Sequence, residues 1–451
     1  MDMQVPARSG RDASVLNQRR LCKIASSPHA YVRGSTARFY ELIAGMPAGT
    51  LPEGPPVWIC GDAHLGNLGA LAAPDGRIDI QIRDLDQTVV ANPAFDLVRL
   101  ALSLVTAALN ATLPGIVTAR MMDAMADGYA DGIADPEGAE RGVEPSEIVV
   151  TTKRRALGRR WRHLSRERLK GKAARLPRGS RFFDLDADEQ ASLTALIGAP
   201  EIRRLVLALG SAADDAEIRL LDAAYWIKGC SSLGRLRYAV LVEVLGGDRP
   251  QLALLDVKEA VPHLAPAAAG IAVPSDHAER VVAGARAMSP NLGDRMVAGH
   301  VGDRAGGTPV TVRELLPQDL KIDAEQFSRG EAVRVSRHLA AILGRAHGRQ
   351  REGAAGDPDD RYGGGEALRA HDVDEGALAL VRGHRPDGRA PARLPGALPP
   401  HRPGGAGRGL SRPRRGALPP RRRLTPSPPS PTPRARRPPR RIPGRPVIRW
   451  R

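Results

Sequence analysis

The sequence predicts an α+β fold with two lobes. Three observations support it. Helical patterns dominate the first 225 residues, strand-like patterns dominate residues 225–316, and 451 residues are enough for two or three domains with an ample core. The segment after residue 350 follows neither pattern, so we expect the folded part to end near that point.

The individual elements follow from hydrophobic periodicity and from turn residues. Helical patterns cover 14–45 (interrupted at 26–34), 95–109, about 116–134, 145–222, about 276–289 and 330–349. Strand patterns cover 57–60, 77–82, 238–245, 251–260 and 308–316. The turn GGDRP joins 238–245 to 251–260 as a hairpin. Asp276 is the expected N-cap of its helix, with Glu279 three residues later.

The net charge of +17 is concentrated at one end of the chain. Residues 351–451 hold 23 Arg against 9 Asp and Glu, which leaves only +3 for the first 350 residues. The basic run at 151–172 contains a single Trp and is interpreted as a solvated helix face rather than a nucleic-acid patch. We therefore expect no specific nucleic-acid partner.

The end of the chain differs in composition from the rest. Residues 351–451 contain no Lys and no Phe, hold 19 of the 39 prolines, and have no acidic residue after Asp387. Such a segment buries too little apolar surface to offset its ordering entropy, which predicts disorder. Two origins stay open: a reading-frame artefact of a GC-rich gene, or a genuine basic tail.

The cysteine content and hydropathy predict a cytoplasmic protein. Cys22, Cys60 and Cys230 are too few and too scattered for a disulfide framework or a Cys-x-x-Cys metal site. The N-terminus has no apolar segment typical of a secretory signal, and no run of about 18 apolar residues occurs. We expect no membrane association.

Polar residues at two strand ends are the strongest functional signal. The loop CGDAHLGN (60–67) places Asp62 and Asn67 five residues apart, and the strand at 77–82 leads into Asp84 and Asp86. Two carboxylates and an amide oxygen make a hard-oxygen pocket suited to Mg²⁺. Phosphoryl transfer needs this set, because the metal neutralises charge while one Asp orients and deprotonates the acceptor hydroxyl.

These segments resemble a known enzyme class. GDAHLGN and the following DLDQTVVANPAFDLVRL (84–100) are similar to the HGDxHxxN and IDxxD…GDPxxDLA patterns of aminoglycoside and choline kinases. The resemblance implies that Asp62 is the catalytic base and that Asn67 and Asp84 are metal ligands. It also implies that Asp96 braces the loop. Cys60 stands where those kinases usually have His.

The nucleotide-binding half of such kinases is found later in this chain. KGCSSLGRLRYAVLVEV (228–244) resembles a phosphate-covering glycine loop, and LLDVKEA (254–260) resembles the strand that carries the phosphate-pairing lysine. VRELLPQDLKID (312–323) resembles the hinge strand that holds adenine, and the helix ending LGRAHG resembles the one that leads into the catalytic loop. The residues that this resemblance assigns to ATP are Gly229, Ser231, Ser232, Gly234, Lys258, its ion-pair partner Glu279, and Glu314.

The order of these parts implies a circularly permuted protein-kinase-like fold that uses ATP and Mg²⁺. The expected parts of the folded chain are an N-terminal helical segment (1–56), the catalytic and metal-binding part (57–135), a basic helical connection (136–224), the nucleotide lobe (225–320) and a helix leading back to the catalytic part (321–350). The tail follows at 351–451. The chain to about residue 350 also resembles the bacterial family called domain of unknown function 2252. The matching segments are KIASSPHAYVRG, VWICGDAHLGN, IRDLDQ, LLDVKEA and VRELLPQDLKID.

Other interpretations were weighed against this one. Asp62 and Asn67 also suit a capped turn, Lys258 a surface strand, and Glu279 a helix cap. His64 is expected to hydrogen-bond the loop backbone, with metal ligation as the alternative, and His347 to be a packed structural residue. Arg33 and Gly34 are expected to line the acceptor site because they cluster in SSPHAYVRG.

The functional hypothesis is an ATP- and Mg²⁺-dependent phosphotransferase that acts on a hydroxyl of an unidentified small-molecule or protein acceptor. The alternatives are a non-catalytic nucleotide-binding protein of kinase-like fold, and transfer of AMP on the same fold. A metallophosphoesterase needs further metal-binding clusters that this sequence lacks, such as a GNHD motif.

Overall fold

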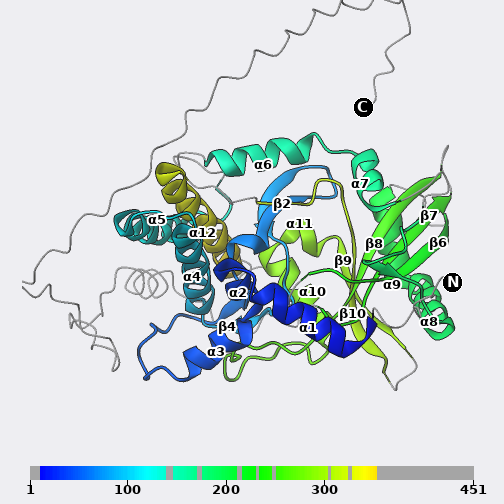
Figure 1. The fold of residues 1–451 in the computed structure, drawn as a ribbon, viewed down its shortest axis with the longest axis horizontal. Helices are drawn as coiled ribbons and strands as arrows, with labels where there is room; N and C mark the ends of the chain where they lie inside the picture. Colours follow the sequence, from blue (N-terminus) through cyan, green and yellow to red (C-terminus); the bar gives the residue numbers. More distant parts are fainter. Residues whose placement is uncertain are drawn as a thin grey trace, which may run out of the picture. The chain divides into compact units, whose positions relative to one another are not determined.

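A computed structural model describes most of the chain up to residue 352. The described residues are 11–138, 146–169, 175–210, 216–229, 233–245, 250–302, 306–322 and 328–352. They all belong to the first of two units into which the chain divides, residues 1–392. The expected tail lies outside the described residues from 353 onward, and so do Ser231 and Ser232. The structure is a mixed α+β fold (Figure 1).

Three short helices open the described chain: α1 (Ala13–Ile24), α2 (Pro28–Gly34) and α3 (Thr36–Ala44). The helices break between α1 and α2, at the start of the expected interruption 26–34, but the rest of that segment is α2. The Ser27 hydroxyl accepts a hydrogen bond from Ala30 N at 3.1 Å, and Pro28 occupies the first helical position, where its missing N–H costs nothing.

The largest sheet has six antiparallel strands in the order β5-β6-β7-β8-β10-β9. Their bounds are β5 (Phe182–Phe183), β6 (Glu217–Trp226), β7 (Arg237–Leu245), β8 (Gln251–Glu259), β9 (Met296–Val301) and β10 (Thr308–Glu314). The predicted hairpin is confirmed by the pairing of β7 with β8, in which Val240 faces Leu255. Strand β6 begins eight residues before the predicted change at 225, because its first half is polar and only partly buried.

Helices cover both faces of this sheet. On one face, α8 (Ala187–Gly198) and α9 (Pro200–Gly210) form a core with alternate strand residues such as Val240 and Val257. On the other face, α7 (Trp161–Arg168) contributes Leu164 to a core with Leu241. The predicted helical stretch at 145–222 is therefore only partly helical: besides α6 (Glu147–Leu157), α7, α8 and α9 it contains β5 and the start of β6.

Two smaller sheets carry the loops of the sequence motif. Strand β1 (Val57–Ile59) pairs with β4 (Val89–Ala91). Strand β2 (Leu68–Ala72) pairs with β3 (Ile78–Ile82) and with β11 (Leu320–Lys321). The short 3₁₀ helix η2 (Leu65–Asn67) connects β1 to β2. Strands β2 and β4 were missed in the sequence because they are short and buried throughout.

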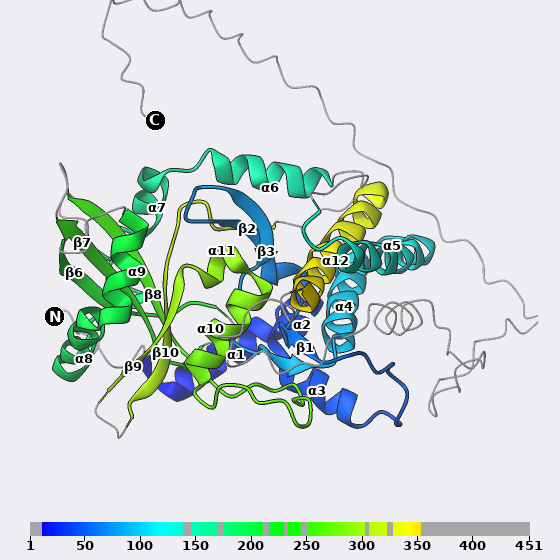
Figure 2. The same cartoon turned by 180° about the vertical axis from the view of Figure 1, so that it is seen from behind.

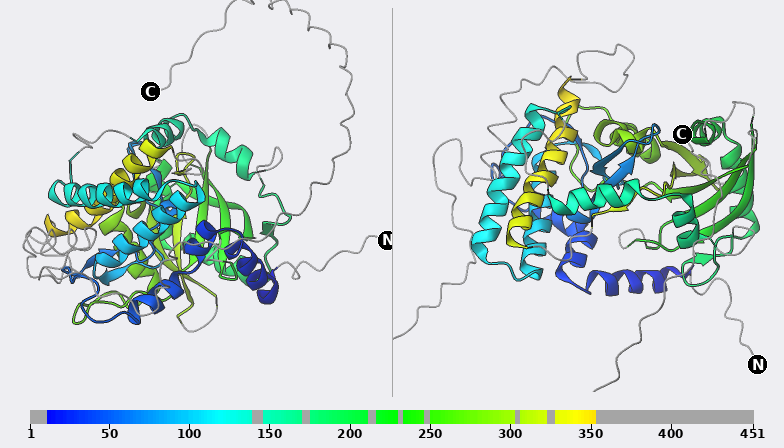
Figure 3. Two further views of the ribbon diagram at one scale, coloured as in Figure 1. Left: turned by 60° about the vertical axis from the view of Figure 1, so that its left-hand side comes forward. Right: turned by 90° about the horizontal axis from the view of Figure 1, so that it is seen from above.

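A helical layer packs beside these small sheets. Its main members are α4 (Ala94–Asn110), α5 (Gly115–Ala134) and α12 (Arg329–Glu352), and α10 (His277–Met288) and α11 (Pro290–Gly293) lie between it and the six-stranded sheet (Figures 1 and 2). Helices α5 and α12 lie side by side (Figure 3). Glycine allows their close approach, since a Cβ on Gly128 or Gly344 would collide with a backbone oxygen of the other helix.

The end of α12 is joined to the start of β1 through the side chain of Gln350. Trp58 N donates to Gln350 Oε1 at 2.6 Å, and Gln350 Nε2 donates to Trp58 O at 3.0 Å. The amide side chain thus satisfies both backbone groups of one residue of β1. Residues 292 positions apart in sequence are adjacent here.

Candidate functional site

Asp96 fixes the backbone of the loop that follows β1. Its carboxylate accepts hydrogen bonds from Cys60 N at 2.6 Å and from Gly61 N at 2.9 Å. Gly61 has φ of 71°, and a Cβ there would collide with the backbone of Gln87. Only glycine suits both conditions. His347 lies beside the same acid, with Nε2 3.4 Å from Asp96 Oδ2, and is buried as expected.

Asp62 lies at the turn of this loop and is held by a buried arginine. Arg99 donates to Asp62 Oδ1 from Nε at 2.9 Å, and it also bonds Val32 O and Thr36 Oγ1. Burial raises the pKa of Asp62 to about 6, although Arg99 favours the ionised form. A carboxylate with a pKa close to the working pH is suited to accept a proton.

The environment of His64 differs from the expectation. Its Nδ1 is buried with no hydrogen-bond partner in the described part of the chain, so the side chain does not bond the loop backbone. Its Nε2 lies 3.9 Å from Asp62 Oδ2. Burial and the positive charges of Arg33 and Arg99 hold the pKa of His64 well below its usual range, so the ring is neutral beside Asp62.

Asn67 joins the two motif loops. Its Nδ2 donates to Asp84 O at 2.7 Å, to Asp62 O at 3.3 Å and to Cys60 Sγ at 3.3 Å. In addition, Arg83 N donates to Asn67 O at 2.8 Å. Because the amide nitrogen is used by these contacts, the amide oxygen remains for a ligand. Asp62, Asn67 and Asp84 all line the same cavity, as the sequence predicted.

Lys258 comes to this site from the middle of the six-stranded sheet. Its Nζ lies 2.9 Å from Asp84 Oδ1 and 2.5 Å from Asp86 Oδ2. Removal from bulk water opposes ionisation of Asp84, but the ammonium of Lys258 outweighs this effect and lowers the pKa of Asp84 below its usual range. Burial and the charge of Asp84 raise the pKa of Asp86.

The expected partner of Lys258 is in a different place. Glu279 is exposed in the first turn of α10, where only its backbone N bonds the capping Asp276. The next residue, Arg280, points inward and donates to Asp86 O at 3.1 Å and to Val261 O at 2.7 Å. Successive residues on a helix face different directions, so this register turns Glu279 away from Lys258.

The other expected nucleotide-binding residues are only partly brought together. Gly229 lines the cavity, whereas Gly234 does not. Both glycines have φ of 91°. Lys23 of α1 donates to Gly229 O at 3.0 Å, a contact that the sequence did not predict. Glu314 ends β10 outside the cavity lining, and burial raises its pKa to about 7.

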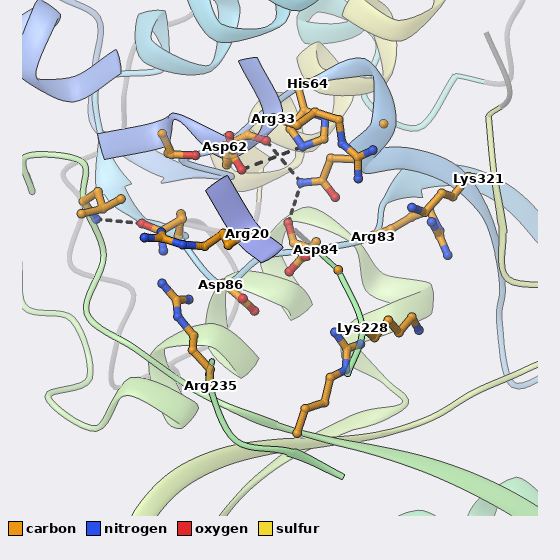
Figure 4. Close-up of a pocket in the computed structure, with 18 of the residues that line it drawn as sticks. Arg20, Arg33, Asp62, His64, Arg83, Asp84, Asp86, Lys228, Arg235 and Lys321 are labelled. Carbon is orange, nitrogen blue, oxygen red and sulfur yellow. Dashed lines mark hydrogen bonds and ion pairs between the residues drawn. The ribbon is translucent and has the colours of Figure 1, made fainter. Parts of the chain in front are cut away.

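The cavity has a volume of about 340 Å³ and is strongly basic. Its lining contains eight Lys or Arg residues and only three acidic residues. The cations are Arg20, Arg33, Arg83, Lys228, Arg235, Arg237, Arg313 and Lys321, and the acids are Asp62, Asp84 and Asp86. The side chains come from both sides of the site (Figure 4). Such a lining favours an anionic ligand with several charges.

Three of these cations surround one buried acid, Asp256. Arg237 bonds both oxygens of Asp256, at 2.8 and 2.5 Å, and Arg313 Nη2 lies 3.4 Å from the same carboxylate. Lys228 Nζ lies 4.0 Å from Asp256 Oδ2. The sequence did not predict this group, because its members come from three neighbouring strands and from the residues just after β6. The sequence shows Arg99 as a single Arg in an apolar helix, but it does not show that Asp62 is the partner of Arg99.

The oxygen donors of the cavity determine which metal ion the site could bind. Among the described residues no group of three His, Cys, Asp or Glu side chains is placed to hold a metal ion. Mg²⁺ needs no such cage, since it commonly takes one or two carboxylates together with water and substrate phosphates. Asp84 with the amide oxygen of Asn67 supplies donors of that kind. The residues present therefore fit a magnesium ion that arrives with a phosphate ligand.

Within the described ranges, no helix is long and apolar enough to cross a membrane. No curated protein matches the chain, and no solved structure matches it. A family model does match. It is described as "Uncharacterized protein conserved in bacteria (DUF2252)" and covers residues 11–387, which include both motif loops, Lys258 and α12. On that match over most of its length, the chain belongs to the DUF2252 family of bacterial proteins.

Proposed function

We propose that this protein is an ATP- and Mg²⁺-dependent phosphotransferase with a circularly permuted, kinase-like arrangement of its parts. The single observation that carries the proposal is the meeting of Lys258 with Asp84, 2.9 Å apart across 174 residues of sequence. The two residues belong to separate sequence motifs, LLDVKEA and DLDQ. A lysine on a strand and an acid after the catalytic loop meet at the phosphates in protein kinases.

The order of elements in the sheet region also supports the proposal. The hairpin of β6 and β7 is followed by β8 with Lys258, then by α10, and then by β9 and β10. This is the succession of glycine loop, lysine strand, helix and hinge strand expected for a nucleotide lobe. The contact of Gln350 with Trp58 joins the end of α12 to β1, the strand that precedes the loop of Asp62, and this supports the permuted order.

The proposed reaction assigns one task to each group. The acceptor hydroxyl oxygen attacks the γ-phosphorus of ATP, the bond to the β–γ bridging oxygen breaks, ADP leaves, and Asp62 takes the hydroxyl proton. Arg99 holds the Asp62 carboxylate in place. Asp84 and Asn67 would hold Mg²⁺, which would neutralise charge on the phosphates. Lys258 and the lining cations Lys228, Arg235 and Arg237 bind phosphate oxygens of ATP.

Thermal unfolding of the full chain with ATP, with and without Mg²⁺, tests the nucleotide site. A ligand at 100 times its Kd stabilises the native state by about 2.7 kcal/mol, which is visible as a rise in Tm. We expect a Mg²⁺-dependent rise that Asp84→Asn abolishes. Asp75→Asn is the matched control, because Asp75 is an exposed acid in the turn between β2 and β3. No rise in the wild-type chain would refute the proposal.

Product analysis then separates the remaining alternatives. Release of ADP during ATP turnover supports phosphotransfer, whereas transfer of AMP releases pyrophosphate. Binding of Mg²⁺-ATP without turnover in the presence of a broad set of hydroxyl acceptors favours a non-catalytic nucleotide-binding protein.

A further inference from the structure

Three cations on the catalytic-loop side of the cavity have no carboxylate partner among the described residues. They are Arg33 at the end of α2, Arg83 directly after β3, and Lys321 in β11. The deeper Arg237 and Arg313 differ, because both contact Asp256. Cations that have no ion-pair partner of their own attract an anionic ligand.

The catalytic loop is shaped to admit these side chains. A Cβ on Gly66 would lie 3.1 Å from Arg33 Nε and 3.3 Å from the ring of His64. A Cβ on Gly69 would collide with Leu320 O and would come within 2.5 Å of Arg83 Cδ. The glycines of HLGNLG therefore leave room for two arginines beside the catalytic loop.

Polar atoms in this region are buried without partners. In the part of the chain that the structure describes, Arg33 Nε, Arg83 Nε and His64 Nδ1 have no hydrogen-bond partner. Two of these are N–H donors on permanently charged groups, and a buried donor without an acceptor is costly.

The three cations lie on the side of the site that the acceptor would occupy. Arg33 is a neighbour of His64, which lies beside Asp62 (Figure 4). Arg83 and Lys321 lie across Asp84 from Arg20 and Arg235 in the same view. The glycine loop with Gly229 and Lys228 approaches the cavity from the six-stranded sheet instead.

We infer that Arg33, Arg83 and Lys321 form an anion-binding subsite for the acceptor, so that the acceptor carries a phosphate group in addition to its reacting hydroxyl. Three positive charges match a phosphate dianion better than a single carboxylate, and the guanidinium forks match its oxygens. The identification of this anion as part of an acceptor rests on the proposed function. The existence of the subsite does not.

Glycerol 3-phosphate is a suitable probe, because it carries a hydroxyl and a phosphate, and glycerol is its uncharged counterpart. Titrations followed by Tm use the full chain at constant ionic strength, with and without saturating Mg²⁺-ADP. We expect glycerol 3-phosphate to raise Tm further when Mg²⁺-ADP is already bound, and glycerol to have no effect. Acetate, as a carboxylate of single charge, is expected to bind at least tenfold more weakly.

Variants locate the response. Arg83→Gln and the double variant Arg33→Gln/Lys321→Gln are expected to weaken glycerol 3-phosphate binding by about tenfold or more, and to keep the rise in Tm with Mg²⁺-ATP. The double variant keeps the test open if Arg83→Gln fails to fold, since Lys321 is exposed. Arg155→Gln removes an exposed charge of α6 outside the cavity and is the matched control.

The outcomes separate the two proposals. Competition between glycerol 3-phosphate and Mg²⁺-ADP would assign these cations to the nucleotide and overturn the acceptor subsite. Unchanged binding in both variants would overturn it as well. A response to glycerol 3-phosphate that the variants remove, with no response to Mg²⁺-ATP, would uphold the anion subsite and refute the phosphotransferase proposal.

Discussion

Lys258 and Asp84 are in direct contact, with Nζ 2.9 Å from Oδ1, although they come from different sheets. Lys258 belongs to β8 of the six-stranded sheet, whereas Asp84 follows β3 of the small one. The ammonium also contacts Asp86 and so keeps two neighbouring carboxylates from repelling each other. This ion pair therefore connects the two halves of the candidate site, and it offsets the negative charge of Asp84 and Asp86.

Replacing Lys258 with Met is expected to weaken both stability and nucleotide binding. The change leaves Asp84 and Asp86 without their shared cation, which should lower the free energy of unfolding on the order of 1–3 kcal/mol. Urea unfolding at neutral pH measures this loss, and Lys258→Arg, which keeps the charge, should retain most of the stability. A Met variant as stable as the wild type would mean that the ion pair contributes nothing.

The assignment of Asp62 as the base predicts a loss of turnover in Asp62→Asn with Mg²⁺-ATP binding largely intact. It also predicts the pH dependence. The pKa of Asp62 is raised to about 6, and the base must be ionised to accept a proton. Turnover should therefore fall as the pH drops below about 6 and level off above it. A pH profile of ATP turnover checks this, and unaltered turnover in the Asn variant would exclude Asp62 as the base.

Arg99 is expected to be essential for both fold and chemistry. It is fully buried, bonds Asp62, and reaches Val32 O and Thr36 in the N-terminal helices. Breaking a buried pair by removing one partner costs on the order of 3–5 kcal/mol, which Arg99→Met should show in urea unfolding. If the variant folds, loss of the cation should raise the pKa of Asp62 and move the acid limb of turnover above pH 6. Arg99→Lys should shift that limb less.

The buried carboxyl of Glu314 should make the stability of the fold depend on pH. Burial raises its pKa from 4.5 to about 7, so ionisation is less favourable in the folded chain than in the unfolded one. Below pH 4.5 the group is neutral in both states. As the pH rises from 4.5 to 7, its charge increasingly destabilises the fold, by up to about 3 kcal/mol. Glu314→Gln should thus be more stable than the wild type at pH 8 and equal to it near pH 4. The exposed Glu279→Gln should show no such trend.

The sequence predicted most of the helices and the contents of the motif loops, but it missed short strands such as β2 and β4. Asp62, Asn67 and Asp84 line one cavity, and Asp96 holds the loop amides, because each is fixed by hydrogen bonds within about forty residues. Lys258 reached the same site because a strand places its side chains at regular intervals. The α+β class was likewise visible from periodicity alone.

Other residues were beyond a reading of the sequence, for physical reasons. Glu279 was placed by its spacing from Lys258, but a rotation of one residue along α10 brings Arg280 inward instead. The group around Asp256 depends on which strands are neighbours in the sheet, and that order is set by packing rather than by local pattern. The pairing of Arg99 with Asp62 depends in the same way on how α4 crosses the loop.

The contact between Gln350 and Trp58 has a consequence for how the chain folds during its synthesis. The loop that contains Asp62 emerges from the ribosome early, but Gln350, whose side chain bonds β1, is made 292 residues after Trp58. At typical rates of 5–20 residues per second, this interval is roughly 15–60 seconds. Through that time β1 has an open edge and α5 lacks the helix it packs against. The nascent N-terminal half is therefore the part of this protein expected to need chaperone protection most.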